Sequence, residues 1–309
     1  YYTKDDVREI LDYARRRQIR VVPEIEIPGH SAEVMKAYPD LRCELGADKS
    51  YKLYEHDLCV GHEATYRFFE KVLDEVCELF EDEFVHIGGD ECNMNNWKQC
   101  PRCQALMKRE GLTDVRQLQA RITRHFAGYL AKKGRRIVGW SEIAAGGDLP
   151  SDAAVMCWKG ADIGCWSILC NAGSFYFDYE QGLADDPVPN YFWGWPTSLE
   201  KVYSFNEMNT MAGKKRVLGG QANSWTEMTI SERELQWKVW PRACAVAELF
   251  WSNPQPKNFE EFARRVEVDR RRMIADGVNV APITRIDRIW EALNAHASRI
   301  AGGTTVKGI

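Results

Sequence analysis

The chain alternates amphipathic stretches with short apolar runs, and this alternation restricts its fold more than any other feature. Apolar residues recur at helical spacing in five stretches, at residues 4–17, 62–80, 115–132, 231–249 and 258–275. Short strand-like runs fall between them, at residues 19–22, 84–87, 136–140, 154–158, 174–178 and 217–225. Strands that alternate with helices predict an α/β fold with a parallel sheet and crossover helices.

Polar and aromatic residues stand at or just after the ends of these predicted strands. In chain order they are Glu24, Glu26, His30, Asp90, Glu91, Trp140, Glu142, Trp158, Tyr176, Asp178, Trp225 and Glu227. Such side chains at the carboxyl ends of successive parallel strands are typical of a TIM (β/α)8 barrel. About six of its eight strands are recognisable, and the chain begins with a helix. We therefore expect an N-terminally truncated barrel over residues 1–280, followed by a C-terminal helix and tail at 281–309.

The most informative segment is Phe-Val-His-Ile-Gly-Gly-Asp-Glu at residues 84–91. Its two glycines let the backbone turn sharply, or let another group approach closely, before the adjacent carboxylates of Asp90 and Glu91. An Asp-Glu pair also commonly opens a helix, because acidic side chains favour the first turn. The preceding His86, the double glycine and the similar ends of the other strands favour a catalytic pair instead.

Composition restricts the partners of this protein. The net charge of −4, without a dominant basic stripe, argues against a nucleic-acid partner. No apolar run approaches the ~18–20 residues that a membrane-spanning helix needs. Because the first residue is Tyr rather than Met, we expect a processed or truncated chain, and we expect a secreted or periplasmic bacterial protein. We expect no cofactor, and the sequence leaves the oligomeric state open.

The ten cysteines are many for a cytosolic enzyme and few for a disulfide scaffold. Cys43 and Cys59 bracket a loop, and a disulfide between them is compatible with an oxidising compartment. Cys92, Cys100 and Cys103 fall within twelve residues, so a zinc site is an alternative to free thiols or a local disulfide. Because no fourth ligand stands out, we predict no metal site.

Several of these segments together resemble glycoside hydrolase family 20, the β-N-acetylhexosaminidases. They are HIGGDE at 86–91, PEIEIPGH at 23–30, WSE at 140–142, YFD at 176–178 and WTE at 225–227. The resemblance spans about residues 1–275 and implies a chain that begins after the family's second barrel strand. The family's arginine on the first strand, which binds hydroxyls of the terminal sugar, has no counterpart by motif. A sugar-binding barrel with impaired catalysis is therefore an alternative function.

The resemblance implies an exo-acting, retaining enzyme that removes terminal β-linked GlcNAc or GalNAc from a glycan or glycoconjugate. Two adjacent acids are poorly placed to flank a glycosidic bond from both sides, and substrate-assisted families do not need that arrangement. Glu91 is then the acid that protonates the leaving oxygen, and Asp90 orients the 2-acetamido group. The acetamido oxygen attacks the anomeric carbon and gives an oxazolinium intermediate. Tyr176 is implied to donate a hydrogen bond to that oxygen.

The same resemblance assigns further residues to substrate binding. Trp140, Trp158 and Trp225 are implied to form the walls around the sugar ring and the N-acetyl methyl group, since aromatic faces pack against apolar surfaces. Asp178 and Glu227 are implied to hold sugar hydroxyls. Core packing is the simpler explanation for any one of these tryptophans taken alone.

The two histidines are assigned to the same substrate-binding set. For both His30 and His86, a supporting role behind the residues that touch the sugar is an alternative. A third function, from a different class, is a metal hydrolase that uses His30, His86 and Asp90. Such an enzyme would lose its activity when a chelator is added.

Overall fold

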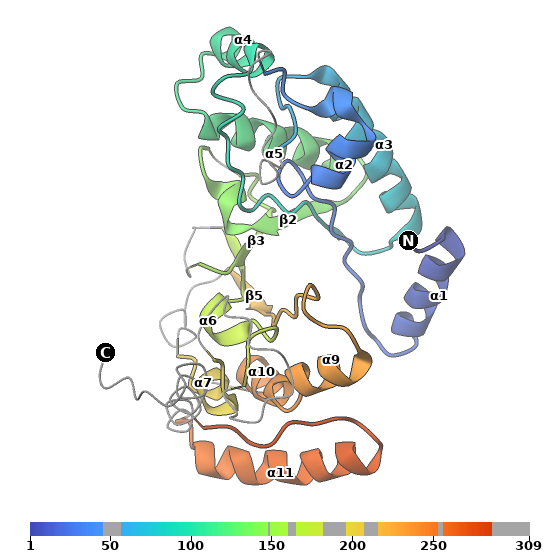
Figure 1. Cartoon of the computed structure of the whole chain (residues 1–309), viewed down its shortest axis with the longest axis vertical. Helices are drawn as coiled ribbons and strands as arrows, with labels where there is room; N and C mark the ends of the chain where they lie inside the picture. The colour runs from blue at the N-terminus through green and yellow to red at the C-terminus, as the bar shows by residue number, and fades with distance from the viewer. Residues whose placement is uncertain are drawn as a thin grey trace, which may run out of the picture. The chain divides into compact units, whose positions relative to one another are not determined.

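The computed structural model describes residues 1–45, 57–147, 149–159, 165–181, 196–206, 216–252 and 256–285 (Figure 1). The chain divides into two compact units. The first unit comprises Tyr1–Cys157 with Asp162–Ser167, and the second comprises Trp158–Ala161 with Ile168–Ile309. None of the described helices is both long enough and apolar enough to cross a membrane.

The first unit is built on a parallel ladder of three strands, β1 (Phe84–His86), β2 (Arg136–Trp140) and β3 (Ala154–Cys157). Phe84 stands opposite Arg136, and Val138 stands opposite Ala154. All four residues of β3 and the last four of β2 are buried. Strands buried on both faces are typical of a parallel sheet covered by helices, and they confirm the predicted α/β class.

The helices of the first unit are α1 (Lys4–Arg15), α2 (Ala32–Ala37), α3 (Glu63–Leu79), α4 (Pro101–Glu110) and α5 (Arg116–Ala131), with the 3-10 turns η1 (Pro39–Leu41) and η2 (Ser141–Ala144). Buried apolar side chains on α3 and α5, including Phe69 and Phe126, form part of the core. Polar pairs also join these two helices, since Tyr129 donates to Asp74 at 2.6 Å. Figure 1 shows α3 and α5 on the same side of β2.

The second unit contains β5 (Val217–Gly220), the last two residues of β4 (Trp166–Leu169), and the helices α6 (Ala172–Phe175), α7 (Leu199–Tyr203), α9 (Glu232–Val239), α10 (Arg242–Trp251) and α11 (Phe259–Ala275). The ring of Tyr203 stacks on Phe262 with the centroids 4.0 Å apart. Glu248 accepts hydrogen bonds from Tyr203 at 2.9 Å and from Arg265 at 2.7 Å. These contacts hold α7, α10 and α11 together.

The prediction of a strand at residues 19–22 is wrong. Ile19 and Val22 are 57% and 41% exposed, so this run is not a buried strand. The following residues pair with β1 instead, because the Ile25 N–H donates to the His86 carbonyl and the Ile27 N–H to that of Ile87, both at 2.9 Å. The parallel pairing with β1 therefore begins a few residues after the apolar run that suggested a strand.

Three further predictions need correction. Residues 174–178 are not a strand, since α6 ends at Phe175 and a single parallel bridge joins Tyr176 to Asn223. The strand predicted over 217–225 ends at Gly220. The helix predicted over 231–249 is two helices, α9 and α10, separated at Pro241, whose ring nitrogen has no N–H to donate.

The remaining organisational predictions are left open by the described residues. Five strands lie in these parts of the chain, one of which, β4, was not predicted, so the count of six stays a prediction. The C-terminal helix and tail predicted at 281–309 fall outside the described residues from position 286 onward.

Candidate active site

The backbone turns at the two glycines that follow β1. Gly88 and Gly89 have φ angles of +62° and +92°, which L-residues with a Cβ rarely adopt. A Cβ on Gly88 would overlap the carboxylate of Glu26, and one on Gly89 would overlap Ile143. The Trp140 N–H holds the turn in place by donating to the Gly88 carbonyl at 2.9 Å. Glycine is therefore required at both positions, as the sequence predicted.

Asp90 and Glu91 leave this turn into different environments. The Asp90 side chain is 16% exposed and the Glu91 side chain is 55% exposed. Nε2 of His30 lies 3.3 Å from Oδ2 of Asp90 and 3.6 Å from Oε2 of Glu91. The hydrogen bond to Asp90 raises the pKa of His30 to about 9, helped by the charges of Asp90, Glu26 and Glu91 and opposed by burial. At neutral pH a positive imidazolium therefore bridges the two carboxyl groups.

His30 reaches the acids because its segment runs against their backbone. A Cβ on Gly29 would lie 2.7 Å from the Asp90 carbonyl oxygen and 3.1 Å from Sγ of Cys92, so only glycine fits there. Ser31 fixes the same turn by donating its hydroxyl to the Gly29 carbonyl at 2.8 Å. The Pro-Gly-His motif thus supplies both the close approach and the imidazole.

His86, Trp140 and Glu24 form a second group behind the acids. The Trp140 indole N–H donates to Oε1 of Glu24 at 2.9 Å, and Nδ1 of His86 lies 3.0 Å from the same oxygen. His86 and Trp140 are 6% and 2% exposed. Burial acts to raise the pKa of Glu24, but the His86 and Trp140 contacts outweigh it and the net shift is downward.

Glu26 is the least favourably placed carboxyl group in the first unit's site. Burial raises its pKa to about 8, and the charges of Asp90 and Glu24 add to that rise. Among the described residues its Oε2 is buried without a hydrogen-bond partner. At neutral pH Glu26 is therefore largely protonated, and it can donate a proton in a hydrogen bond.

The residues that converge on a potential metal position differ from the set named for the metal-hydrolase alternative. His30, Asp90 and Glu91 each offer a ligand atom within 4.8 Å of the others. His86, which that alternative included, lies beside Glu24 instead. His30 lies within 3.6 Å of both carboxylates, and its positive charge accounts for their proximity without an ion.

The second unit groups the other predicted aromatic residues. The Tyr176 ring stacks on Trp158, with centroids 6.2 Å apart and planes 10° apart. Trp225 meets the same tyrosine edge-on at 5.9 Å. Tyr176 is brought beside Trp225 by its backbone, because Phe177 N–H donates to the Asn223 carbonyl. The three predicted residues Trp158, Tyr176 and Trp225 thus lie together.

Asp178 follows Tyr176 and is half-buried. Burial raises the pKa of Asp178, backbone N–H groups of Asp178 and Trp225 lower it, and the charge of Glu227 raises it. Its Oδ1 is buried without a partner among the described residues. Glu227 is exposed in the same unit.

Sequence reasoning missed two residues that support these groups. Gln119 on α5 is fully buried and donates from Nε2 to the Gly89 carbonyl at 2.5 Å. Arg242 on α10 is also fully buried and donates to the carbonyls of Phe177 at 2.6 Å and Tyr179 at 2.9 Å. A glutamine in a helix and an arginine after a proline carry no local signal of these contacts.

Comparison with known proteins supplies the family. The family model for the glycosyl hydrolase family 20 catalytic domain matches residues 1–254 of this chain. The chain belongs to glycosyl hydrolase family 20. Catalytic domains of this family are TIM barrels, in agreement with the parallel ladder and its covering helices.

The relatives are similar over most of this chain but are longer. A beta-hexosaminidase of Porphyromonas gingivalis is 39% identical over 293 residues, which is 90% of this chain and 37% of the relative. Beta-hexosaminidase subunit beta of Mus musculus is 30% identical, over 91% of this chain and 52% of its own length. The family 20 exo-β-N-acetylglucosaminidase of Vibrio harveyi, solved with N-acetylglucosamine, has a TM-score of 0.82 at 28% identity, over 91% of this chain and 46% of its own. The chain therefore spans about half or less of each of these proteins.

Proposed function

We propose that this protein is an exo-acting, retaining β-N-acetylhexosaminidase that removes terminal β-linked GlcNAc or GalNAc from glycans. Family membership supports hydrolysis of a glycosidic bond, and the names of the relatives support the hexosaminidase class. The adjacency of Asp90 and Glu91 supports substrate-assisted catalysis, since neither acid can reach the opposite face of the sugar from one strand end.

The observation that carries the proposal is that one of the two Asp90 carboxylate oxygens lacks a hydrogen-bond donor. Its Oδ2 faces His30 at 3.3 Å, whereas its Oδ1 is buried without a hydrogen-bond partner in the described structure. A buried acceptor without a donor is costly, so such a group points to a ligand that completes it. The N–H of a 2-acetamido group is a donor of the required kind. Asp90 would orient that group so that its carbonyl oxygen faces the anomeric carbon.

Glu91 has the exposure that a proton donor to the leaving group needs. Its side chain is 55% exposed and lies next to the buried Asp90, so it can meet a glycosidic oxygen that enters from solvent. In the first step Glu91 gives its proton to the leaving oxygen while the acetamido oxygen attacks C1. In the second step Glu91 takes a proton from the water that opens the oxazolinium ring. Both substitutions invert the anomeric carbon, and the net result is retention.

The other substrate contacts belong to the same proposal. Tyr176 donates its hydroxyl proton to the acetamido oxygen, and its packing against Trp158 supports a fixed ring position. Asp178, with a buried acceptor oxygen that lacks a partner in the described structure, accepts from a sugar hydroxyl. Trp225 and Glu227 complete this substrate-binding set. Trp140, His86 and His30, in the first unit, are assigned to substrate binding as well.

The direct test is hydrolysis of a chromogenic β-GlcNAc substrate by purified wild-type protein and by Glu91→Gln. We expect the variant to lose about two to four orders of magnitude in kcat, because neither protonation of the leaving oxygen nor activation of the attacking water is then assisted. Glu33→Gln on α2, an exposed carboxyl outside this site, is the matched control and should keep wild-type activity. Wild-type protein that binds GlcNAc without turnover would instead indicate the sugar-binding alternative.

A second test separates substrate-assisted catalysis from a two-carboxylate mechanism. Asp90→Asn should lower kcat strongly with the 2-acetamido substrate. An otherwise identical substrate with a 2-hydroxyl should be nearly inert with the wild type, because it has no internal nucleophile. Comparable rates with both substrates would contradict the assignment of Asp90.

A further inference from the structure

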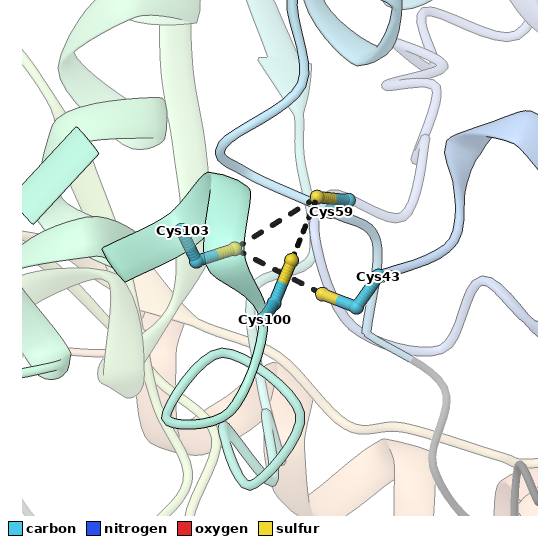
Figure 2. A group of neighbouring side chains, drawn as sticks. All are labelled: Cys43, Cys59, Cys100 and Cys103. Atoms are coloured by element: carbon cyan, nitrogen blue, oxygen red, sulfur yellow. Dashed lines mark hydrogen bonds between the residues drawn. The ribbon is translucent and has the colours of Figure 1, made fainter. Parts of the chain in front are cut away.

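Four cysteines from separate parts of the first unit converge on one buried point (Figure 2). They are Cys43, Cys59, Cys100 and Cys103, whose residues are 4%, 0%, 0% and 0% exposed. Figure 2 shows their side chains directed toward one another from two loops and the start of α4. Cys92, which the sequence grouped with Cys100 and Cys103, is directed elsewhere, with Sγ 3.9 Å from the Gly89 carbonyl oxygen.

The four sulfur atoms all lie within 4.8 Å of one another, and three of their separations match a tetrahedral thiolate site. The separations are 3.8 Å for Cys43–Cys103, 3.7 Å for Cys59–Cys100 and 3.8 Å for Cys59–Cys103. Four sulfurs that each lie about 2.3 Å from one zinc ion are about 3.8 Å apart at the corners of a regular tetrahedron. A disulfide requires about 2.05 Å between its sulfurs, far less than any of these separations.

The local fold brings the two halves of the group together. Cys100 precedes α4 and Cys103 lies in its first turn, as in the paired-cysteine spacing of structural zinc sites. Cys59 is held beside the segment of Cys43 because its N–H donates to the Leu41 carbonyl at 2.8 Å. A Cβ on Gly61 would overlap the backbone at Arg102 and Cys103, so a glycine lets this loop reach α4.

We propose that Cys43, Cys59, Cys100 and Cys103 bind one Zn²⁺ ion as a closed structural site. Cys100 and Cys103 supply two of the four ligands, and Cys43 and Cys59, which could also have formed a disulfide by sequence, supply the other two. On binding, the four thiols release their protons to solvent and become thiolates, so no oxidant is needed. With all four positions taken by sulfur, the ion has no open position for chemistry.

The zinc ion would fix the segment that follows the catalytic acids. Residues 92–99 connect Glu91 to Cys100, and their other anchors lie beside Cys59. Asp57 accepts from the Met94 N–H at 2.8 Å, and the buried Trp97 donates its indole N–H to the Leu58 carbonyl at 2.8 Å. Zinc binding would therefore hold this segment at Cys100, and, through Cys59, beside its contacts with Asp57 and Leu58. This inference does not depend on the proposed activity.

The decisive measurement is the metal content of the purified whole protein. Protein produced with added zinc and stripped of loosely held metal on a chelating resin should retain about one Zn²⁺ per chain by mass spectrometry of the metal. Cys77→Ser on α3, a cysteine outside the group, is the matched control and should retain the same amount. Cys103→Ser should lower the zinc content by about ten-fold or more.

A second measurement identifies the ligands and does not rely on a folded variant. Wild-type protein loaded with Co²⁺ should show sulfur-to-cobalt charge-transfer bands and the strong visible absorption of a tetrahedral thiolate site. The group of His30, Asp90 and Glu91 has no sulfur ligand and cannot give these charge-transfer bands. Less than about 0.1 zinc per wild-type chain, or peptide masses that show these cysteines joined in disulfides, would overturn the proposal.

Discussion

Replacing Glu26 by glutamine should stabilise the protein at neutral and alkaline pH. Burial, together with the charges of Asp90 and Glu24, raises the pKa of Glu26 from 4.5 to about 8. Between these two values the folded state binds a proton that the unfolded chain has released. Stability therefore falls as the pH rises through this window.

The magnitude follows from the two pKa values. At pH 7 the unfolded carboxyl is ionised and the folded one is largely protonated, which costs about 3 kcal/mol, at about 1.4 kcal/mol for each pH unit above 4.5. Above pH 8 the cost approaches about 5 kcal/mol as an upper limit. Glutamine resembles the protonated form and carries no such penalty. Burying the amide group of glutamine also has a free-energy cost, but this cost does not change with pH.

Urea unfolding of wild type and Glu26→Gln at pH 4, 7 and 8.5 measures the effect. We expect the stability difference between them to grow in favour of the variant by about 3 kcal/mol from pH 4 to pH 7. Glu33→Gln, at an exposed carboxyl on α2, should show no such growth. A difference that is constant with pH would show that Glu26 is not held in its protonated form, and the reasoning would fail.

Other substitutions test the supporting contacts. Gln119→Leu removes the donor to the Gly89 carbonyl, so it should lower the free energy of unfolding in urea by about 1–3 kcal/mol and should also lower kcat. Unchanged kinetics would show that the turn keeps its shape without this hydrogen bond. Arg242→Met leaves several buried carbonyls without their donor and should cost about 3 kcal/mol or more, seen as a lower Tm; an unchanged Tm would contradict this. In the wild type, kcat/KM should decline near pH 9, because His30 loses its charge as the pH passes its raised pKa. His30→Gln should lower kcat and remove this decline. A decline that persists in the variant would show that another group causes it.

Sequence patterns predicted the elements that local chemistry determines. The helix at 62–80 matches α3, and the strand at 136–140 matches β2 residue for residue. Long amphipathic periods and short buried runs are both local signals. The Gly88-Gly89 turn was also predicted correctly, because its glycines are needed for positive φ.

The features that could not be predicted from the sequence depend on contacts between residues far apart in the chain. Residues 19–22 look like a strand, but whether an apolar run is buried depends on the segment that pairs with it. Gln119 reaches Gly89 across 30 positions, and Cys43 and Cys59 lie 60 and 41 positions from their partners Cys103 and Cys100. Spacing within one segment identifies half of a zinc site, and only the fold supplies the other half.

Glu26 and Asp90 show how stability and function oppose each other in the first unit's site. Both carry a buried oxygen without a partner in the described structure, and the charge of Asp90 helps to keep Glu26 protonated. A sequence selected only for stability would replace Glu26 by a neutral residue, because unfavourable burial of this kind is usually retained where activity needs it. If Glu26 is retained for activity, Glu26→Gln should gain stability and lose activity together, because glutamine cannot ionise beside Asp90. If the variant gained stability with full activity, Glu26 would have no part in the reaction, and its burial would need another explanation.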